Sequence, residues 1–141
     1  MFCEWCSAVV VGTGPLVSIS LPLRIASVAN ARFNRWDTAR SAKAHRTIAR
    51  AKVADALRRV RGITADDRVA VRLTRIAPSK LDDDNLSSGF KSTRDGVADA
   101  LGIDDGSARV RWTYAQERGG VKVYAARVEV WIGAPSMPCP E

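Results

Sequence analysis

The chain has 141 residues, of which 46% are hydrophobic, and this is enough for one globular core but too little for two of ordinary size. Its 22 Lys and Arg outnumber its 15 Asp and Glu, so the formal net charge is +7. This excess favours a polyanionic partner, with nucleic acid first and an anionic membrane surface second.

The sequence contains no apolar run near the roughly 20 residues that cross a bilayer. The first fourteen residues include Glu4 and lack the basic cluster that begins a signal peptide. We therefore expect a cytoplasmic protein that binds nucleic acid and has no membrane partner.

Residues 1–15 are expected to form an N-terminal leader outside the folded domain. They contain Cys3 and Cys6, a single C-x-x-C pair, and only Cys139 and His45 could complete a four-ligand zinc site. Structural zinc sites usually take two such pairs, so we expect thiols without a bound metal here.

The first folded elements are a strand and a long helix. Residues 16–23 alternate between apolar and polar side chains and include Pro22, which predicts a strand at a sheet edge. Asp37 is expected to cap a helix over about residues 38–60, because its carboxylate can accept hydrogen bonds from first-turn amides. The later half of this helix has an apolar stripe that predicts packing against a sheet. The stripe consists of Ala49, Val53, Leu57 and Val60.

A second strand and a second helix follow. Residues 67–77 alternate again and predict the strand. The helix is expected to begin at the aspartates 82–84 and to end at Gly102, because glycine readily adopts the left-handed conformation that follows a helix. Its expected buried face consists of Leu86, Phe90, Val97 and Leu101.

The last two expected strands cover residues 109–116 and 121–132, and Gly119–Gly120 between them predicts a hairpin. The order is then strand, helix, strand, helix, strand, strand. We expect an α/β fold in which two helices cover a small mixed four-stranded sheet. A single domain over residues 16–133 accounts for these elements, and 134–141 form an irregular tail.

Aspartates flank the second helix. Asp82 and Asp84 would share a face if their segment were extended, and two convergent carboxylates bind a hard cation such as Mg²⁺ or Mn²⁺. Asp104 and Asp105, which follow the helix, are the expected further ligands. In nucleases such ions activate water and stabilise the leaving oxygen. The alternative is that these residues only cap a helix and form turns.

A straight helix from Asp84 to Leu101 would separate its ends by roughly 27 Å. One ion could not then contact both Asp84 and Asp105. Either the helix breaks near Gly89 or Gly96, or two copies pack antiparallel and share each site between subunits.

Basic residues concentrate in the first helix and the third strand. Ten of the 22 fall between residues 32 and 61, where Asp37 and Asp55 are the only acids. Rows of such charges suit DNA phosphates, although a solvated helix face is the alternative. The expected DNA contacts are Arg40, Lys43, Arg46, Arg50, Arg109 and Arg111.

Residues 82–105 carry the most specific pattern in the chain. D-x-D-N-L at 82–86 is followed by Lys91, Asp99-Ala100-Leu101 and Asp104-Asp105. This pattern resembles the RusA family of Holliday junction resolvases, which are small phage-associated endonucleases. The stretch LPLRIASVAN near the N-terminus also resembles that family, and the overall similarity extends over residues 17–132.

The resemblance implies a RusA-like fold and a homodimer that cuts four-way DNA junctions in recombination and repair, in a bacterial host or encoded by a prophage. It also implies Mg²⁺ as cofactor, held by Asp82, Asp84 and Asp105 with Asp104 adjacent. The family's catalytic lysine follows the second aspartate by four residues, where this chain has Ser88, so Lys91 is expected to take its role. The alternatives are a DNA-binding module on the same fold that does not cut, and a structural dimer whose aspartates serve as caps.

Overall fold

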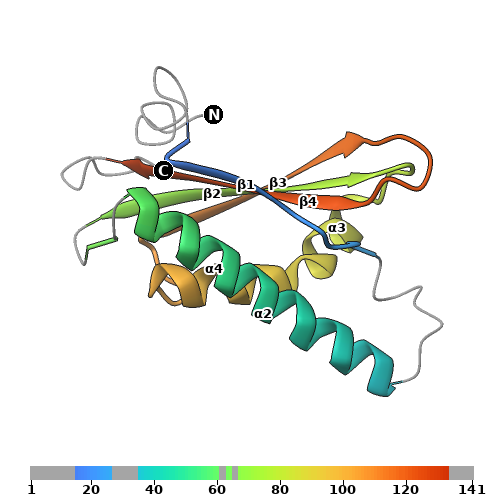
Figure 1. The fold of residues 1–141 in the computed structure, drawn as a ribbon, viewed down its shortest axis with the longest axis horizontal. Coiled ribbons are helices and arrows are strands. Elements are labelled where there is room, and N and C mark those ends of the chain that lie inside the picture. Colours follow the sequence, from blue (N-terminus) through green and yellow to red (C-terminus); the bar gives the residue numbers. More distant parts are fainter. Residues whose placement is uncertain (1–14, 27–34, 61–62, 65–66, 134–141) are drawn as a thin grey trace.

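The computed structural model describes residues 15–26, 35–60, 63–64 and 67–133, with the backbone alone for 35–39 (Figure 1). The expected tail and the three cysteines lie outside the described residues, as does the expected leader except for residue 15. The elements, in chain order, are β1 (Val17–Leu21), α2 (Arg35–Val60), β2 (Arg68–Ala77), α3 (Asp83–Gly89), α4 (Lys91–Leu101), β3 (Val110–Arg118) and β4 (Ala125–Gly133). This confirms the α/β class, with the second expected helix divided in two.

The four strands form one mixed sheet in the order β1-β4-β2-β3. β2 pairs in parallel with β3 and antiparallel with β4. The expected hairpin at Gly119–Gly120 is therefore wrong, because β2 lies between the two strands that this loop connects. The Gly119 N–H donates to the Ala77 carbonyl at 2.9 Å, so the loop is fixed to the end of β2. β2 is a central strand of the sheet, and its inward residues, including Val69, are fully buried beneath the helices.

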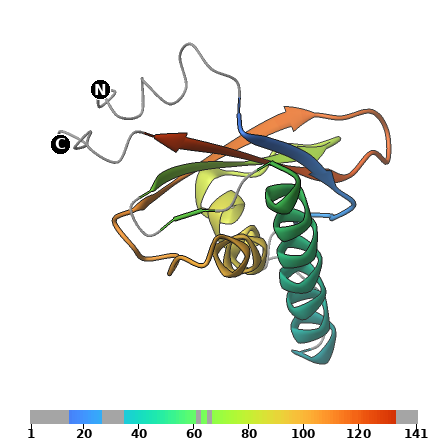
Figure 2. The same ribbon diagram turned by 60° about the vertical axis from the view of Figure 1, so that its left-hand side comes forward.

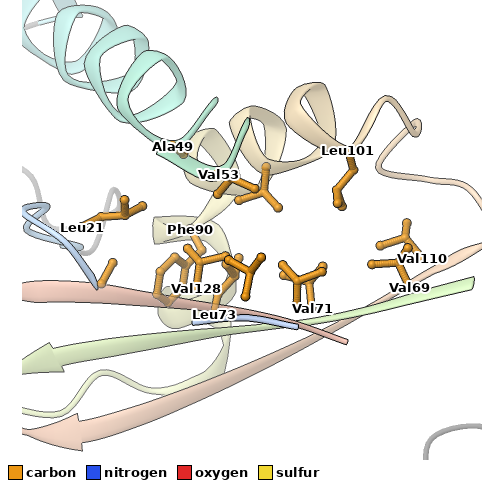
Figure 3. Close-up of a cluster of buried hydrophobic side chains, with 14 of the residues drawn as sticks. Leu21, Ala49, Val53, Val69, Val71, Leu73, Phe90, Leu101, Val110 and Val128 are labelled. Atoms are coloured by element: carbon orange, nitrogen blue, oxygen red, sulfur yellow. The ribbon is translucent and has the colours of Figure 1, made fainter. Parts of the chain in front are cut away.

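The three described helices all lie on one side of the sheet (Figures 1 and 2). Between the layers, Val69, Val71 and Leu73 of β2 meet Val53 of α2 and Leu101 of α4 (Figure 3). The expected buried face of the second helix is confirmed, since its four residues are 0 to 5% exposed.

Two details of the long helix differ from the prediction. α2 begins at Arg35, so Asp37 lies inside the helix and does not precede it as a cap. Ala49, Val53 and Leu57 are buried as expected, but Val60 is 53% exposed. Val60 is the last residue of α2, beyond the turns of the helix that pack on the core.

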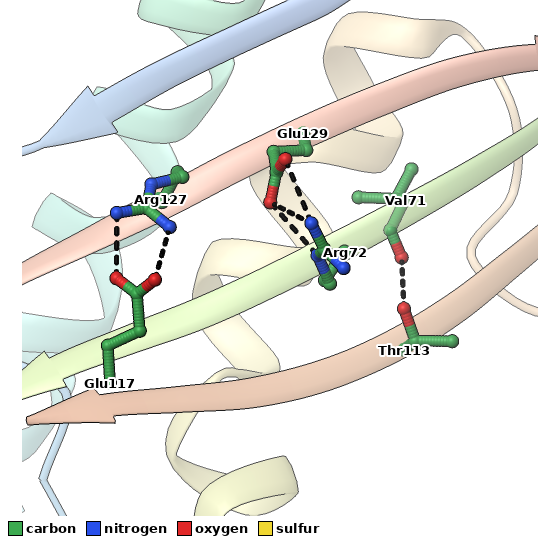
Figure 4. A network of polar contacts seen from close by, with 6 residues as sticks. All are labelled: Val71, Arg72, Thr113, Glu117, Arg127 and Glu129. Carbon is green, nitrogen blue, oxygen red and sulfur yellow. Dashed lines mark hydrogen bonds and ion pairs between the residues drawn. The ribbon is translucent and has the colours of Figure 1, made fainter. Parts of the chain in front are cut away.

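The sheet face opposite the helices carries two ion pairs (Figure 4). Arg72 of β2 donates two hydrogen bonds to Glu129 of β4, at 2.9 and 3.0 Å. Arg127 of β4 reaches past β2 to Glu117 of β3, again with two hydrogen bonds, at 2.9 and 2.7 Å. These paired contacts fix the guanidinium groups in place and connect three neighbouring strands.

α2 and α4 approach each other closely at Gly96. A Cβ atom at this position would lie 2.3 Å from the Arg46 carbonyl oxygen and 2.9 Å from the Ala49 Cβ. The contact involves backbone on both helices, which cannot move aside as a flexible side chain would. Glycine at position 96 is thus required by space.

We expect Gly96→Ala to lower the free energy of unfolding by about 1–3 kcal/mol, because overpacking outweighs the helix preference of alanine, worth about 1 kcal/mol. The midpoint of urea unfolding measures this change. Gly106→Ala is the matched control, since nothing lies within 4 Å of an added Cβ there; its effect should stay within about 0.5 kcal/mol. Equal midpoints for Gly96→Ala and wild type would contradict the close packing.

Candidate functional site

The segment between the two acidic groups is broken at Phe90. α3 ends at Gly89 and α4 begins at Lys91. Phe90 is fully buried, and its ring stacks on that of Tyr114 with centroids 5.9 Å apart. A Cβ on Gly89 would lie 2.9 Å from the Ala26 carbonyl oxygen, so α3 packs closely there. The break confirms the first of the two expected positions.

The first acidic group, Asp82–Asp84, is exposed at the start of α3. Asp82 is the N-cap, and its Oδ1 accepts a hydrogen bond from the Asn85 N–H at 3.0 Å. Asp84 lies in the first helical turn, so it does not share an extended segment with Asp82 as expected. Ser88, which has the place of the family's lysine, donates its hydroxyl to the Asp84 carbonyl oxygen at 2.9 Å. The capping role is therefore present at Asp82, and the carboxylates of Asp83 and Asp84 next to it are exposed.

The loop that leads into this acidic group is held by two inward-facing side chains of the sheet. The Gln116 amide accepts from the Leu81 N–H at 2.9 Å and donates to the Leu81 carbonyl at 2.7 Å. Arg75 donates to the carbonyl oxygens of Ile25, at 2.7 Å, and of Ser79. Burial lowers the pKa of the Arg75 guanidinium from its ordinary value. β3 thus fixes Leu81, the residue just before Asp82, and β2 fixes Ser79 earlier in the same loop.

The second acidic group follows α4, which ends at Gly102 with φ +70° as predicted. Asp104 is exposed and forms a turn, with its carbonyl accepting from the Ser107 N–H at 2.9 Å. Asp105 is half-buried and lies next to Arg94.

Arg94 is the cation next to Asp105. Its Nε lies 3.4 Å from the Asp105 carboxylate, and its Nη2 donates to the Asp105 carbonyl at 3.0 Å. The guanidinium also lies over the Trp112 ring, 4.9 Å from the centroid, and donates to the Tyr114 hydroxyl at 3.0 Å. Lys91, the residue expected to act on phosphate, is exposed at the start of α4. Arg94 was not among the site residues predicted from the sequence.

The two acidic groups do not come together in one subunit. Asp82–Asp84 follow the carboxyl end of β2, whereas Asp104 and Asp105 precede the amino end of β3, and these parallel strands place them at opposite ends of the sheet (Figure 1). The 11 residues of α4 lie between them and span about 16 Å. Within the described parts of the chain, no three or more His, Cys, Asp and Glu side chains form a group that could hold a metal ion.

Arg46 and Arg109, which were expected to contact DNA, form hydrogen bonds within the fold. Arg46 donates to both carboxylate oxygens of Asp99, at 2.8 and 3.1 Å, and connects α2 to α4. Arg109 donates to the carbonyl oxygens of Asp67 and Thr64, at 3.1 and 2.6 Å. Among the expected DNA contacts on α2, Arg40, Lys43 and Arg50 are exposed, and Arg46 is exposed as well although it is paired with Asp99. Arg111 is half-buried in β3.

The side chains that the sequence analysis missed share one signal: a charged or polar residue on an apolar face. Arg94 fills the gap in the stripe between Phe90 and Val97, and Arg75 points inward between Leu73 and Ala77. Such residues mark places where the backbone of another segment needs a donor.

Comparisons with known proteins assign no family. No protein-family model matches the chain, and no curated protein matches it significantly. No helix in the described ranges has the length and apolar character to cross a membrane. The RusA resemblance stays a prediction based on residues 82–105.

The Arg46–Asp99 pair gives a test by pH. The hydrogen bond from Arg46 lowers the pKa of the Asp99 carboxyl from its ordinary value. Because the folded pKa is the lower one, the pair adds stability above the ordinary Asp pKa of about 4, and this stability is lost as the pH falls through the lowered pKa.

We expect Arg46→Ala to raise the Asp99 pKa toward its ordinary value and to weaken the loss of stability at acid pH. Carboxyl ¹³C NMR titration measures the pKa, and urea midpoints at neutral and acid pH measure the stability. Arg40→Ala, an exposed change on the same helix, should leave the Asp99 titration unchanged. An Asp99 pKa that is the same with and without Arg46 would refute the contact.

Proposed function

We propose that this protein is a Mg²⁺-dependent endonuclease that cuts branched DNA as a homodimer, in the manner of Holliday junction resolvases acting in the cytoplasm. One observation carries the proposal: the carboxylates of the D-x-D-N-L and D-D pattern lie at the two ends of a single α3–α4 unit, where Asp82, Asp84 and Asp104 are exposed and Asp105 is half-buried beside Arg94. Exposed carboxylates are accessible to a hard cation, which prefers oxygen ligands.

A shared site follows from the separation of the two groups. Two copies related by a two-fold axis, with their α3–α4 units antiparallel, would bring Asp82 and Asp84 of one subunit next to Asp105 of the partner subunit. Each dimer would then have two equivalent sites, as symmetric cutting of two strands requires. This arrangement is preferred because the break at Phe90 leaves α4 between the groups.

The proposed roles of the residues follow from their positions. Asp82, Asp84 and Asp105 would hold the ion, with Asp104 adjacent, and Mn²⁺ has the same ligand preference. The ion supplies activated water and neutralises charge on the phosphate. Lys91 is exposed and can contact phosphate, while Arg94 positions the loop that carries Asp105.

The second candidate is a DNA-binding module that does not cut. It is favoured by the lack of a three-ligand group within the described residues and by serine at the family's lysine position. In that case the exposed cations bind DNA, and Asp82 only caps α3.

A labelled four-way junction incubated with Mg²⁺ or EDTA tests the activity. We expect symmetric nicks with Mg²⁺ alone, and a loss of rate of about a hundredfold or more for Asp84→Asn, because a metal ligand supports several kcal/mol of transition-state stabilisation. Asp83→Asn removes the same charge at the neighbouring position and should cut like wild type. Binding without cleavage would support the second candidate, and neither binding nor cleavage would refute both.

Mixing an Asp84→Asn chain with an Asp105→Asn chain tests the shared site. In a shared-site dimer, the mixed species has both defects in one site and an intact second site, so single-strand nicking of the junction returns. Each parent homodimer, assayed alone, is the control and should be inactive. If the mixture is as inactive as the parents, each site lies within one subunit.

A further inference from the structure

A cleft lies between the ends of β2 and β3, beside the acidic group at the start of α3. It has a volume of about 500 Å³ and is lined by residues 77–80 and 116–118. Ser79, Lys80 and Arg118 are exposed, so the cleft opens to solvent along its rim. Its size suits a group such as a nucleotide, and its open side would let a polymer continue past it.

The charge of the cleft favours an anion. Lys80 and Arg118 contribute two positive charges. Glu117 is the acidic residue among the described lining residues, and both of its carboxylate oxygens accept from Arg127 (Figure 4). That hydrogen bonding also lowers the pKa of Glu117 from its ordinary value, so the carboxylate stays ionised and paired. The positive charges of Lys80 and Arg118 are therefore not neutralised by Glu117, the acidic residue of the cleft.

The position of Lys80 is fixed relative to the aspartates. Two residues of chain span at most about 7 Å, so the backbone of Lys80 lies close to that of Asp82. The loop between β2 and α3 cannot shift freely, because Gln116 holds Leu81 at both its N–H and carbonyl and Arg75 holds the Ser79 carbonyl. The backbone that carries Lys80 therefore keeps its place beside the acidic group.

We infer that this cleft binds backbone phosphates of a DNA strand through Lys80 and Arg118 and places the strand beside Asp82–Asp84. The inference rests on the proposed function, in that it takes DNA as the ligand. The proposed contact is separate from the basic residues of α2 and lies at the end of the sheet where β2 and β3 terminate.

The test measures binding without cleavage. Fluorescence anisotropy of a labelled four-way junction is recorded in EDTA over a range of salt concentrations, with the full chain and with Lys80→Ala/Arg118→Ala. We expect the variant to bind about tenfold or more weakly near 0.1 M salt, and its salt slope to fall by about two, since each lost phosphate contact removes about 0.9 from the slope. Lys80→Arg/Arg118→Lys should retain the wild-type slope.

The matched control is Lys52→Ala/Arg59→Ala, which removes two exposed charges from α2 on the side away from Lys43, Arg46 and Arg50. We expect it to keep the wild-type slope, and both double variants should show wild-type thermal unfolding. If wild type binds the junction and Lys80→Ala/Arg118→Ala binds with the same slope, the cleft inference is refuted while the proposed function stands. If wild type binds no DNA, both fail.

Inorganic pyrophosphate separates a strand from a small phosphorylated ligand. Calorimetry should detect at most weak, millimolar binding of pyrophosphate if the cleft serves a strand, because a single small anion makes few of the contacts. Micromolar binding that is lost in Lys80→Ala/Arg118→Ala, with DNA binding unaffected, would overturn the inference in favour of a small ligand.

Discussion

The burial of Phe90 determines how the two acidic groups are presented. Fully burying a side chain of this size stabilises the fold by about 1.5–3 kcal/mol, and here it also stacks on Tyr114 of β3. Because Phe90 separates α3 from α4, Leu86 and Val97 both reach the core from helices that run in different directions (Figure 1). The acidic residues before α3 and after α4 are consequently placed at separate ends of the sheet.

Much of the fold could be predicted because burial follows local spacing. The stripes on α2 and on the α3–α4 segment, the alternation of the strands and the role of Gly102 all depend on residues a few positions apart. Strand pairing, in contrast, depends on residues that are far apart in the sequence. Gly119–Gly120 has the composition of a hairpin turn, but β2 pairs with both β3 and β4 and lies between them. Nothing within residues 109–132 reveals that a third strand lies between the two.

The carboxylates of the candidate site could be picked out from the sequence, but the residues that hold their segments in place could not. Asp82, Asp84 and Asp105 stand out by sequence pattern alone. Arg94 and Gln116, which hold these segments in place, hydrogen-bond to backbone atoms. Every residue has a backbone carbonyl oxygen, so such a contact cannot be recognised from the sequence. Arg75 also has backbone partners in two segments, at Ile25, 50 residues before it, and at Ser79, four residues after it. The signal that the sequence did contain was a polar residue on an otherwise apolar face.

The position of β4 has a consequence for synthesis of the chain. β4 is the last strand to leave the ribosome, yet it lies between β1 and β2 and is the strand with which β1 pairs in the described sheet. The N-terminal strand must therefore wait for the C-terminal one, although the β2-to-β3 unit can assemble earlier. Translation that stops before residue 125 would leave β1 without its sheet partner and one side of β2 open, which exposes strand edges to aggregation.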